Sequence, residues 1–176
     1  MSKAKLKKYL QSLSQEQLVQ VVLDLYSARK EAKEYLEFFM DPNEDDALER
    51  YKKTLKNNYF TTQGRPRAKL NVKLGNDIVA DFVRLDVAPE KVADLMIFHV
   101  EVMMSRIVVR RIIRETAWNS AVTMFRKAVD YINAHNLIKD FERRINRIIE
   151  YSHNAPSYLR VPHRLSQELE ESSNTP

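Results

Sequence analysis

Residues 89–103, PEKVADLMIFHVEVM, carry the pattern from which the fold class follows. Apolar side chains and one histidine recur there every three or four residues, which places them on one face of a helix. They are Val92, Leu95, Met96, His99, Val102 and Met103. Pro89 suits the first helical turn, where a missing N–H leaves no hydrogen bond unmade. We therefore expect a buried helix that begins at residue 89.

The helical pattern continues downstream, with no glycine or proline before Pro156. The β-branched run over residues 107–113 resembles a strand, but its flanks are helical and it has no turn-linked partner. We expect a helix there with a break between Ser105 and Thr116, and further helices over about 116–135 and 137–152. Residues 1–153 are expected to form a single helical domain, and residues 154–176 a C-terminal strap and disordered tail.

Upstream, Ser14 and Gln17 have the spacing of a capping box, which starts a helix expected to run to about Met40. A short basic helix precedes it over about 3–12, and two helices follow over about 42–59, with Asp41 as N-cap and Pro42 at the first helical position, and about 71–85. Gly64-Arg65-Pro66 predicts the turn between the last two. The prediction is an all-α fold of six to seven helices, arranged as antiparallel hairpins in a bundle or short α-α superhelix.

Composition excludes several classes of protein. The 176 residues include two glycines and no cysteine. Phosphate-binding loops need glycine, and thiolate metal sites, disulfides and cysteine nucleophiles need cysteine. No apolar run is long enough for a membrane span, and the basic N-terminal residues lack the apolar stretch of a secretory signal. We expect a cytoplasmic protein, and its net charge of +5 is compatible with an anionic partner.

The segment 50–73 is the best candidate contact for nucleic acid or another anion. It contains eight cations and no acid: Arg50, Lys52, Lys53, Lys56, Arg65, Arg67, Lys69 and Lys73. Such cations can neutralise phosphates, and the interleaved Tyr51, Tyr59 and Phe60 can stack on bases. Gly64-Arg65-Pro66-Arg67 is also similar to the core of a minor-groove AT-hook. The alternative is a solvated helix face, with both tyrosines in the core.

A second basic run is a candidate protein interface, formed by Arg106, Val109, Arg110, Ile112, Ile113 and Arg114. Arginines 106, 110 and 114 form one ridge if the helix is continuous. The ridge either grips an anionic partner or pairs with acids on a neighbouring helix. Apolar residues around it indicate burial on two sides, as in a homodimer interface.

No catalytic, cofactor-binding or metal-binding residues are predicted. Glu150 and His153 have the spacing of half a di-iron motif, but the sequence has no second half. His99 is interpreted as a core histidine with a hydrogen-bond partner. Asp77 and Asp81, beside Arg84, are interpreted as an ion-paired surface face.

Five blocks of sequence resemble a family of small uncharacterised bacterial helical proteins, over about residues 3–110. The blocks are LKKYL (6–10), VLDLY (22–26), AKEYLEFF (32–39), GRP (64–66) and ADLM (93–96). The resemblance implies an all-helical fold and a bacterial origin, and brings no activity, cofactor or partner. The chain departs from the family pattern over residues 106–126, where more aromatic and acidic residues are expected.

Three functions remain. The first is a helical protein-interaction or scaffold module that self-associates, for instance as a homodimer. The second is a nucleic-acid-binding protein that uses residues 50–73, and the third is an enzyme with an unrecognised site. We favour the first, with nucleic-acid binding as the alternative.

Overall fold

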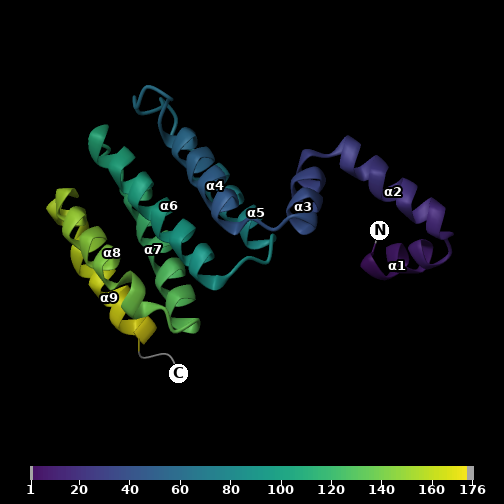
Figure 1. Ribbon diagram of the computed structural model, residues 1–176. Coiled ribbons are helices and arrows are strands. Elements are labelled where there is room, and N and C mark those ends of the chain that lie inside the picture. The colour runs from purple at the N-terminus through teal and green to yellow at the C-terminus, as the bar shows by residue number, and fades with distance from the viewer. Residues whose placement is uncertain (1, 174–176) are drawn as a thin grey trace. The chain divides into compact units, whose positions relative to one another are not determined.

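The computed structural model describes residues 2–173, and within them lie nine α-helices, two short 3-10 turns and a single isolated β-bridge (Figure 1). The all-α class is confirmed, but the expected count of six to seven helices is wrong. The chain divides into two compact units, Met1–Asn43 and Glu44–Pro176. The single domain expected over residues 1–153 stays a prediction.

The N-terminal unit consists of α1 (Lys3–Gln11), α2 (Gln15–Ala28) and α3 (Lys30–Met40). The capping box is present, since Ser14 N–H donates to Gln17 Oε1 at 2.9 Å and Gln17 N–H to Ser14 Oγ at 3.2 Å. The single helix expected up to Met40 is instead broken at Arg29, whose backbone is extended. The break lets Tyr26 donate a hydrogen bond to Glu37 at 2.9 Å, so tertiary contacts rather than glycine or proline cause it.

The C-terminal unit contains the remaining helices. They are α4 (Glu44–Tyr59), α5 (Val72–Val83), α6 (Pro89–Val109), α7 (Glu115–Ala134), α8 (Ile138–Tyr151) and α9 (Val161–Ser173). The break expected between Ser105 and Thr116 is confirmed, because α6 ends and α7 begins within that interval.

Helix α9 forms where only a strap was expected, and with the split at Arg29 it accounts for the miscount. Val161 and Leu165 are fully buried, and Arg164 donates to Asn119 on α7 at 2.8 Å. Packing against α7 therefore stabilises a helix whose own sequence gives little signal. Of the expected disordered tail, residues 174–176 lie outside the described residues.

Helix α6 is the centre of this unit and packs against α4, α5, α7 and α8. It runs in the same direction as α4, since Asp45 pairs with Lys91 at one end and Tyr59 with His99 further along. Trp118 on α7 is also buried, and its indole N–H donates to the Ile112 carbonyl at 3.0 Å. This bond ties the α6–α7 connection to the core.

Gly75 lets α5 approach α4 and α6 closely. A Cβ at this position would lie 2.5 Å from the Tyr59 hydroxyl and closer still to His99 Nε2. The glycine lies inside a helix, where it costs about 1 kcal/mol relative to alanine. Its presence is explained by the space that the Tyr59–His99 pair occupies.

Among residues 2–173, no helix combines the length and the apolar character that crossing a lipid bilayer requires.

The substitution Gly75→Ala is expected to lower the free energy of unfolding by about 1–3 kcal/mol, because the added methyl group overpacks the core and displaces the Tyr59–His99 pair. Urea denaturation followed by circular dichroism measures this. Asn76→Ala, at the next and exposed position of α5, is the control and should be neutral or slightly stabilising. A Gly75→Ala protein more stable than the wild type would contradict the close approach.

Candidate functional site

The basic segment contains a small folded loop between α4 and α5. Thr61 N–H donates to the Arg65 carbonyl at 2.7 Å, and Arg67 N–H donates to the Tyr59 carbonyl at 2.9 Å. Gly64 sits at φ +76°, a left-handed conformation that glycine adopts without strain. The Arg67 side chain turns back and donates from Nε to the Asn57 carbonyl at the C-terminal end of α4. Arg67 therefore caps the C-terminal end of α4 through Nε, while the residue as a whole stays exposed.

The two basic runs meet at Arg106. Its side chain is 1% exposed, and Nη2 donates to the carbonyls of Arg67 and Ala68. Nε and Nη1 are enclosed and have no hydrogen-bond partner within the described residues. Burial, together with the nearby charge of Arg110, lowers the pKa of Arg106. Arg106 thus holds the loop against the end of α6 instead of forming an exposed ridge.

The other predicted cations of the first run divide into two groups. Lys52 pairs with Asp94 at 2.9 Å, and Lys73 pairs with Asp77 at 2.6 Å, so both charges are partly neutralised. The remaining five are exposed and show no ion pair with any described residue: Arg50, Lys53, Lys56, Arg65 and Lys69. The tyrosines are not available for base stacking, because Tyr59 is fully buried and Tyr51 packs on Phe82 at 5.0 Å between ring centroids.

The predicted interface run is not one helical ridge. Arg110 is the C-cap of α6 and Arg114 the N-cap of α7, so a break separates these exposed arginines. Val109 and Ile113 are 55% and 69% exposed, whereas Ile112 is half-buried. With Arg106 inside the core, the exposed apolar part of this surface reduces to Val109 and Ile113.

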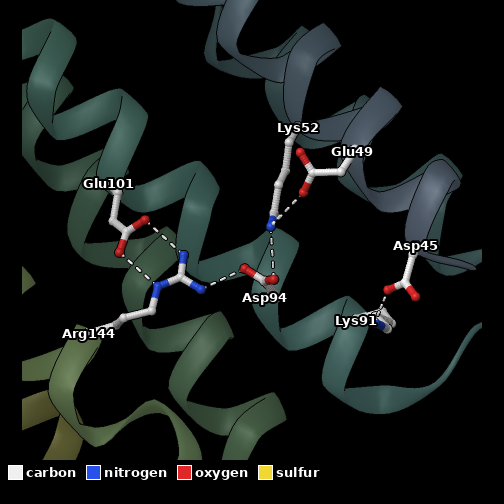
Figure 2. Close-up of polar contacts among 7 residues, drawn as sticks. All are labelled: Asp45, Glu49, Lys52, Lys91, Asp94, Glu101 and Arg144. Carbon is white, nitrogen blue, oxygen red and sulfur yellow. Dashed lines mark hydrogen bonds and ion pairs between the residues drawn. The ribbon is translucent and has the colours of Figure 1, made fainter.

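A network of ion pairs joins α4, α6 and α8 (Figure 2). Arg144 on α8 binds Glu101 with two parallel hydrogen bonds of 2.9 and 2.8 Å, and its third nitrogen donates to Asp94 at 2.6 Å. Lys52 on α4 donates to the other oxygen of Asp94 and to Glu49. Asp94 and Glu101, two carboxylates of α6, are thereby neutralised by cations from neighbouring helices. Such partly buried, bidentate pairs orient helices more than they add net stability.

Lys52 and Arg144 determine the direction in which the pKa of Asp94 is shifted. Partial burial alone would raise its pKa, but the hydrogen bonds and charges of Lys52 and Arg144 outweigh burial and lower it. A lowered carboxyl pKa stabilises the fold above the ordinary value of 3.8, and the stabilisation is lost as the pH falls below it. The network is therefore intact at neutral pH.

His99 and Tyr59 form a buried pair, with 2.7 Å between the Tyr59 hydroxyl and His99 Nε2. Both are nearly inaccessible, with exposed fractions of 3% for His99 and 0% for Tyr59. Burial lowers the pKa of His99 to about 4 and raises that of Tyr59. The interpretation of His99 as a core histidine with a partner is confirmed, and the imidazole is neutral near pH 7.

The remaining candidates form no further site. Asp77 and Asp81 are ion-paired with Lys73 and Arg84, as interpreted from the sequence. Within residues 2–173, histidine and carboxylate side chains do not gather in groups of three or more that could hold a metal ion.

The match to known families is to a family of unknown function, DUF6155, whose model covers residues 1–156. The chain belongs to the DUF6155 family. The predicted resemblance to a family without assigned activity is confirmed, and the match extends beyond residue 110. No curated protein and no solved structure gives a significant match. The bacterial origin and cytoplasmic location stay predictions.

Sequence reasoning missed the ion-pair network and the inward orientation of Arg106. One signal for the network was present, because Asp94 and Glu101 are seven residues apart and so lie on the same side of α6. The cations Lys52 and Arg144 lie far away in the sequence and carry no comparable signal.

Lowering the pH from 6.5 to 4 is expected to reduce the free energy of unfolding by about 3 kcal/mol through His99 alone. The unfolded chain protonates this imidazole near pH 6.5, whereas the folded protein resists protonation down to about pH 4. Urea unfolding at several pH values measures the slope. In His99→Gln the free energy of unfolding should depend less steeply on pH over this interval. In His163→Gln, which replaces an exposed histidine, the pH dependence should remain that of the wild type. Equal slopes in wild type and His99→Gln would contradict the assignment.

Proposed function

We propose that this DUF6155 protein is a helical interaction module that self-associates through its N-terminal unit. The observation that carries the proposal is that no residue from Ser2 to Asn43 is buried. The unit exposes ten large hydrophobic side chains: Leu6, Tyr9, Val19, Val21, Val22, Leu23, Leu25, Tyr35, Phe39 and Met40. A unit of about 40 residues rarely holds together without an added partner, and each of these side chains gains about 2 kcal/mol on burial.

Helix α2 has a wider apolar surface than one neighbour can cover. Val21 and Leu25 lie on the stripe that continues from Leu18, while Val19 and Leu23 lie on the adjacent face. A helix that packs against a single neighbour typically needs an apolar stripe about 100° wide. Helix α3 supplies one neighbour within the unit, so the second apolar face of α2 is available to a partner.

A second copy of the chain suits this face. A two-fold dimer places the same patch of both subunits in contact, and the second face of α2 is apolar on each. Helix α2 carries only two charged residues, Glu16 and Asp24, so pairing it with its own copy brings few like charges together. Val19, Val22 and Leu23 would form the apolar part of the contact, while Glu16 lies on the same side nearer the N-terminus of α2.

The substitution Leu23→Glu is expected to weaken the dimer at least about 30-fold, because it loses an apolar contact and places a charge at the interface. Sedimentation velocity over a concentration series measures the dissociation constant. Ala28→Lys is the matched control: it adds a charge at an exposed position about 140° around α2 from Leu23 and should leave the dimer intact.

Ile113→Glu tests the interface predicted between residues 106 and 114 and separates the two surfaces. Dissociation by Ile113→Glu but not by Leu23→Glu would move the contact to that surface and contradict the assignment to α2. A wild-type protein that is monomeric at all concentrations, with Leu23→Glu lowering its stability, would mean that α2 packs within its own chain.

A second candidate function, binding of nucleic-acid phosphates, is favoured by the meeting of the two basic runs at Arg106. The bonds from Arg106 to the loop carbonyls join the exposed Arg65 and Lys69 to the end of α6, which carries Arg110. Tyr59 is buried and Tyr51 packs on Phe82, so of the three aromatic candidates only the half-buried Phe60 is left to stack on a base. Contacts would therefore be to the backbone and independent of base sequence.

For duplex DNA, the logarithm of affinity is expected to fall with the logarithm of salt concentration at a slope near −4.5 if about five phosphates are contacted. The double substitution Arg65→Ala and Lys69→Ala should make this slope about 1.8 units shallower. Lys73→Ala is the control, since Lys73 is already paired with Asp77. Fluorescence anisotropy at two or more salt concentrations measures the effect, and absence of binding at low salt would remove this function.

A further inference from the structure

A cavity of about 190 Å³ opens between α5, α6 and α7, and nothing in the proposed function uses it. Its walls are apolar, with Val79 on α5, Met96 on α6 and Met124 on α7. Three polar side chains also line it: Asn76, His99 and Lys127. It is open to solvent on one side, so a small molecule can enter without unfolding.

His99 presents a hydrogen-bonding atom without a partner in this region. Its Nε2 is engaged by the Tyr59 hydroxyl, and Nδ1 has no hydrogen-bond partner among the described residues. Nδ1 is also absent from the fully enclosed unpaired atoms, so it retains access to probe-sized space. The cavity is the accessible space that His99 lines.

The tautomer of His99 follows from Tyr59. The Tyr59 hydroxyl is fully buried and makes its hydrogen bond to His99. If Nε2 carried the proton, the hydroxyl hydrogen would have no acceptor, at a cost of about 1–3 kcal/mol. The hydroxyl therefore donates to Nε2, and the proton of the neutral imidazole resides on Nδ1. A buried N–H donor then needs an acceptor that the described residues do not supply.

The packing holds the imidazole in this position. Gly75 brings the backbone of α5 against the Nε2 edge of the ring, and Tyr59 holds the same nitrogen. Rotation of the ring to turn Nδ1 elsewhere would break the buried hydrogen bond. The donor is thus fixed before a ligand arrives, which lowers the entropic cost of binding.

The lining specifies the chemistry of an occupant. The Nδ1–H of His99, the ammonium group of Lys127 and the amide N–H of Asn76 are all donors, and a carboxylate supplies acceptors with the opposite charge. The valine and methionine walls suit an apolar body. The volume equals roughly six water molecules, so the body must be small, such as one ring or a short branched chain.

We propose that the cavity between α5, α6 and α7 binds a small monocarboxylate, with its carboxylate at His99 Nδ1 and Lys127 and its apolar body against Met96 and Met124. The full-length protein is tested with benzoate as the probe and benzamide, its neutral isostere, as the comparison. Nuclear magnetic resonance of methionine methyl groups and of the imidazole nitrogens reports on the two ends of the cavity.

Benzoate is expected to shift the methyl signals of Met96 and Met124 together with the Nδ1 signal of His99, and to bind at least about fivefold more tightly than benzamide. Lys127→Met should weaken benzoate binding about fivefold and leave benzamide unaffected. Lys139→Met, which removes an exposed lysine from α8, is the matched control and should change neither.

Three results would overturn the proposal. They are an Nδ1 that carries no proton, the absence of methyl shifts up to the solubility limit of benzoate, and equal weakening by Lys127→Met and Lys139→Met. Both lysine variants are at exposed positions, so they test the site without disturbing the Tyr59–His99 pair. None of these results depends on self-association or on DNA binding.

Discussion

Helix α6 lies among four other helices of its unit, and each polar side chain that it buries needs a partner in the protein interior. Asp94 and Glu101 form ion pairs with Lys52 and Arg144. His99 is hydrogen-bonded to the Tyr59 hydroxyl, and Arg106 donates to carbonyls of the loop between α4 and α5. The cost of leaving such groups unpaired, about 1–3 kcal/mol each and more for charges, makes this set of contacts a condition for the fold. The positions of α4, α8 and the 60–71 loop all follow from it.

The same constraint explains which features of α6 remain open to function. Glu101 and Asp94 are fully paired, so the network offers no free carboxylate for chemistry. Among the buried side chains of α6, His99 Nδ1 and two nitrogens of Arg106 lack hydrogen-bond partners among the described residues. Of these two residues, His99 is the one that lines the cavity between α5, α6 and α7. The structural role of α6 and the proposed ligand site therefore meet at a single imidazole.

The two units differ in how they satisfy hydrophobic burial. The C-terminal unit encloses large side chains such as Trp118, Phe82 and Phe125, whereas none of the described residues 2–43 of the N-terminal unit is buried. The break at Arg29 brings α3 against α2, yet Val19 and Leu23 of α2 both remain 53% exposed. An interaction role for that unit and a ligand role for the other are compatible, because different residues carry them.

Helix periodicity, the Ser14–Gln17 capping box and the break before residue 116 could be read from the sequence, because each depends on residues a few positions apart. The class, most helix limits and the family resemblance followed from such patterns. The break at Arg29 and helix α9 could not be read from the sequence. The Tyr26–Glu37 contact stabilises the break and the Arg164–Asn119 contact stabilises α9, and both depend on the tertiary structure. Local sequence patterns also do not predict whether an arginine faces solvent or the core. Arg65 and Arg106 are both members of basic runs, yet packing of α6 against a loop about 40 residues earlier buries Arg106. In the same way, the missing Cβ of Gly75 leaves the space that the Tyr59–His99 pair occupies, which no local pattern shows.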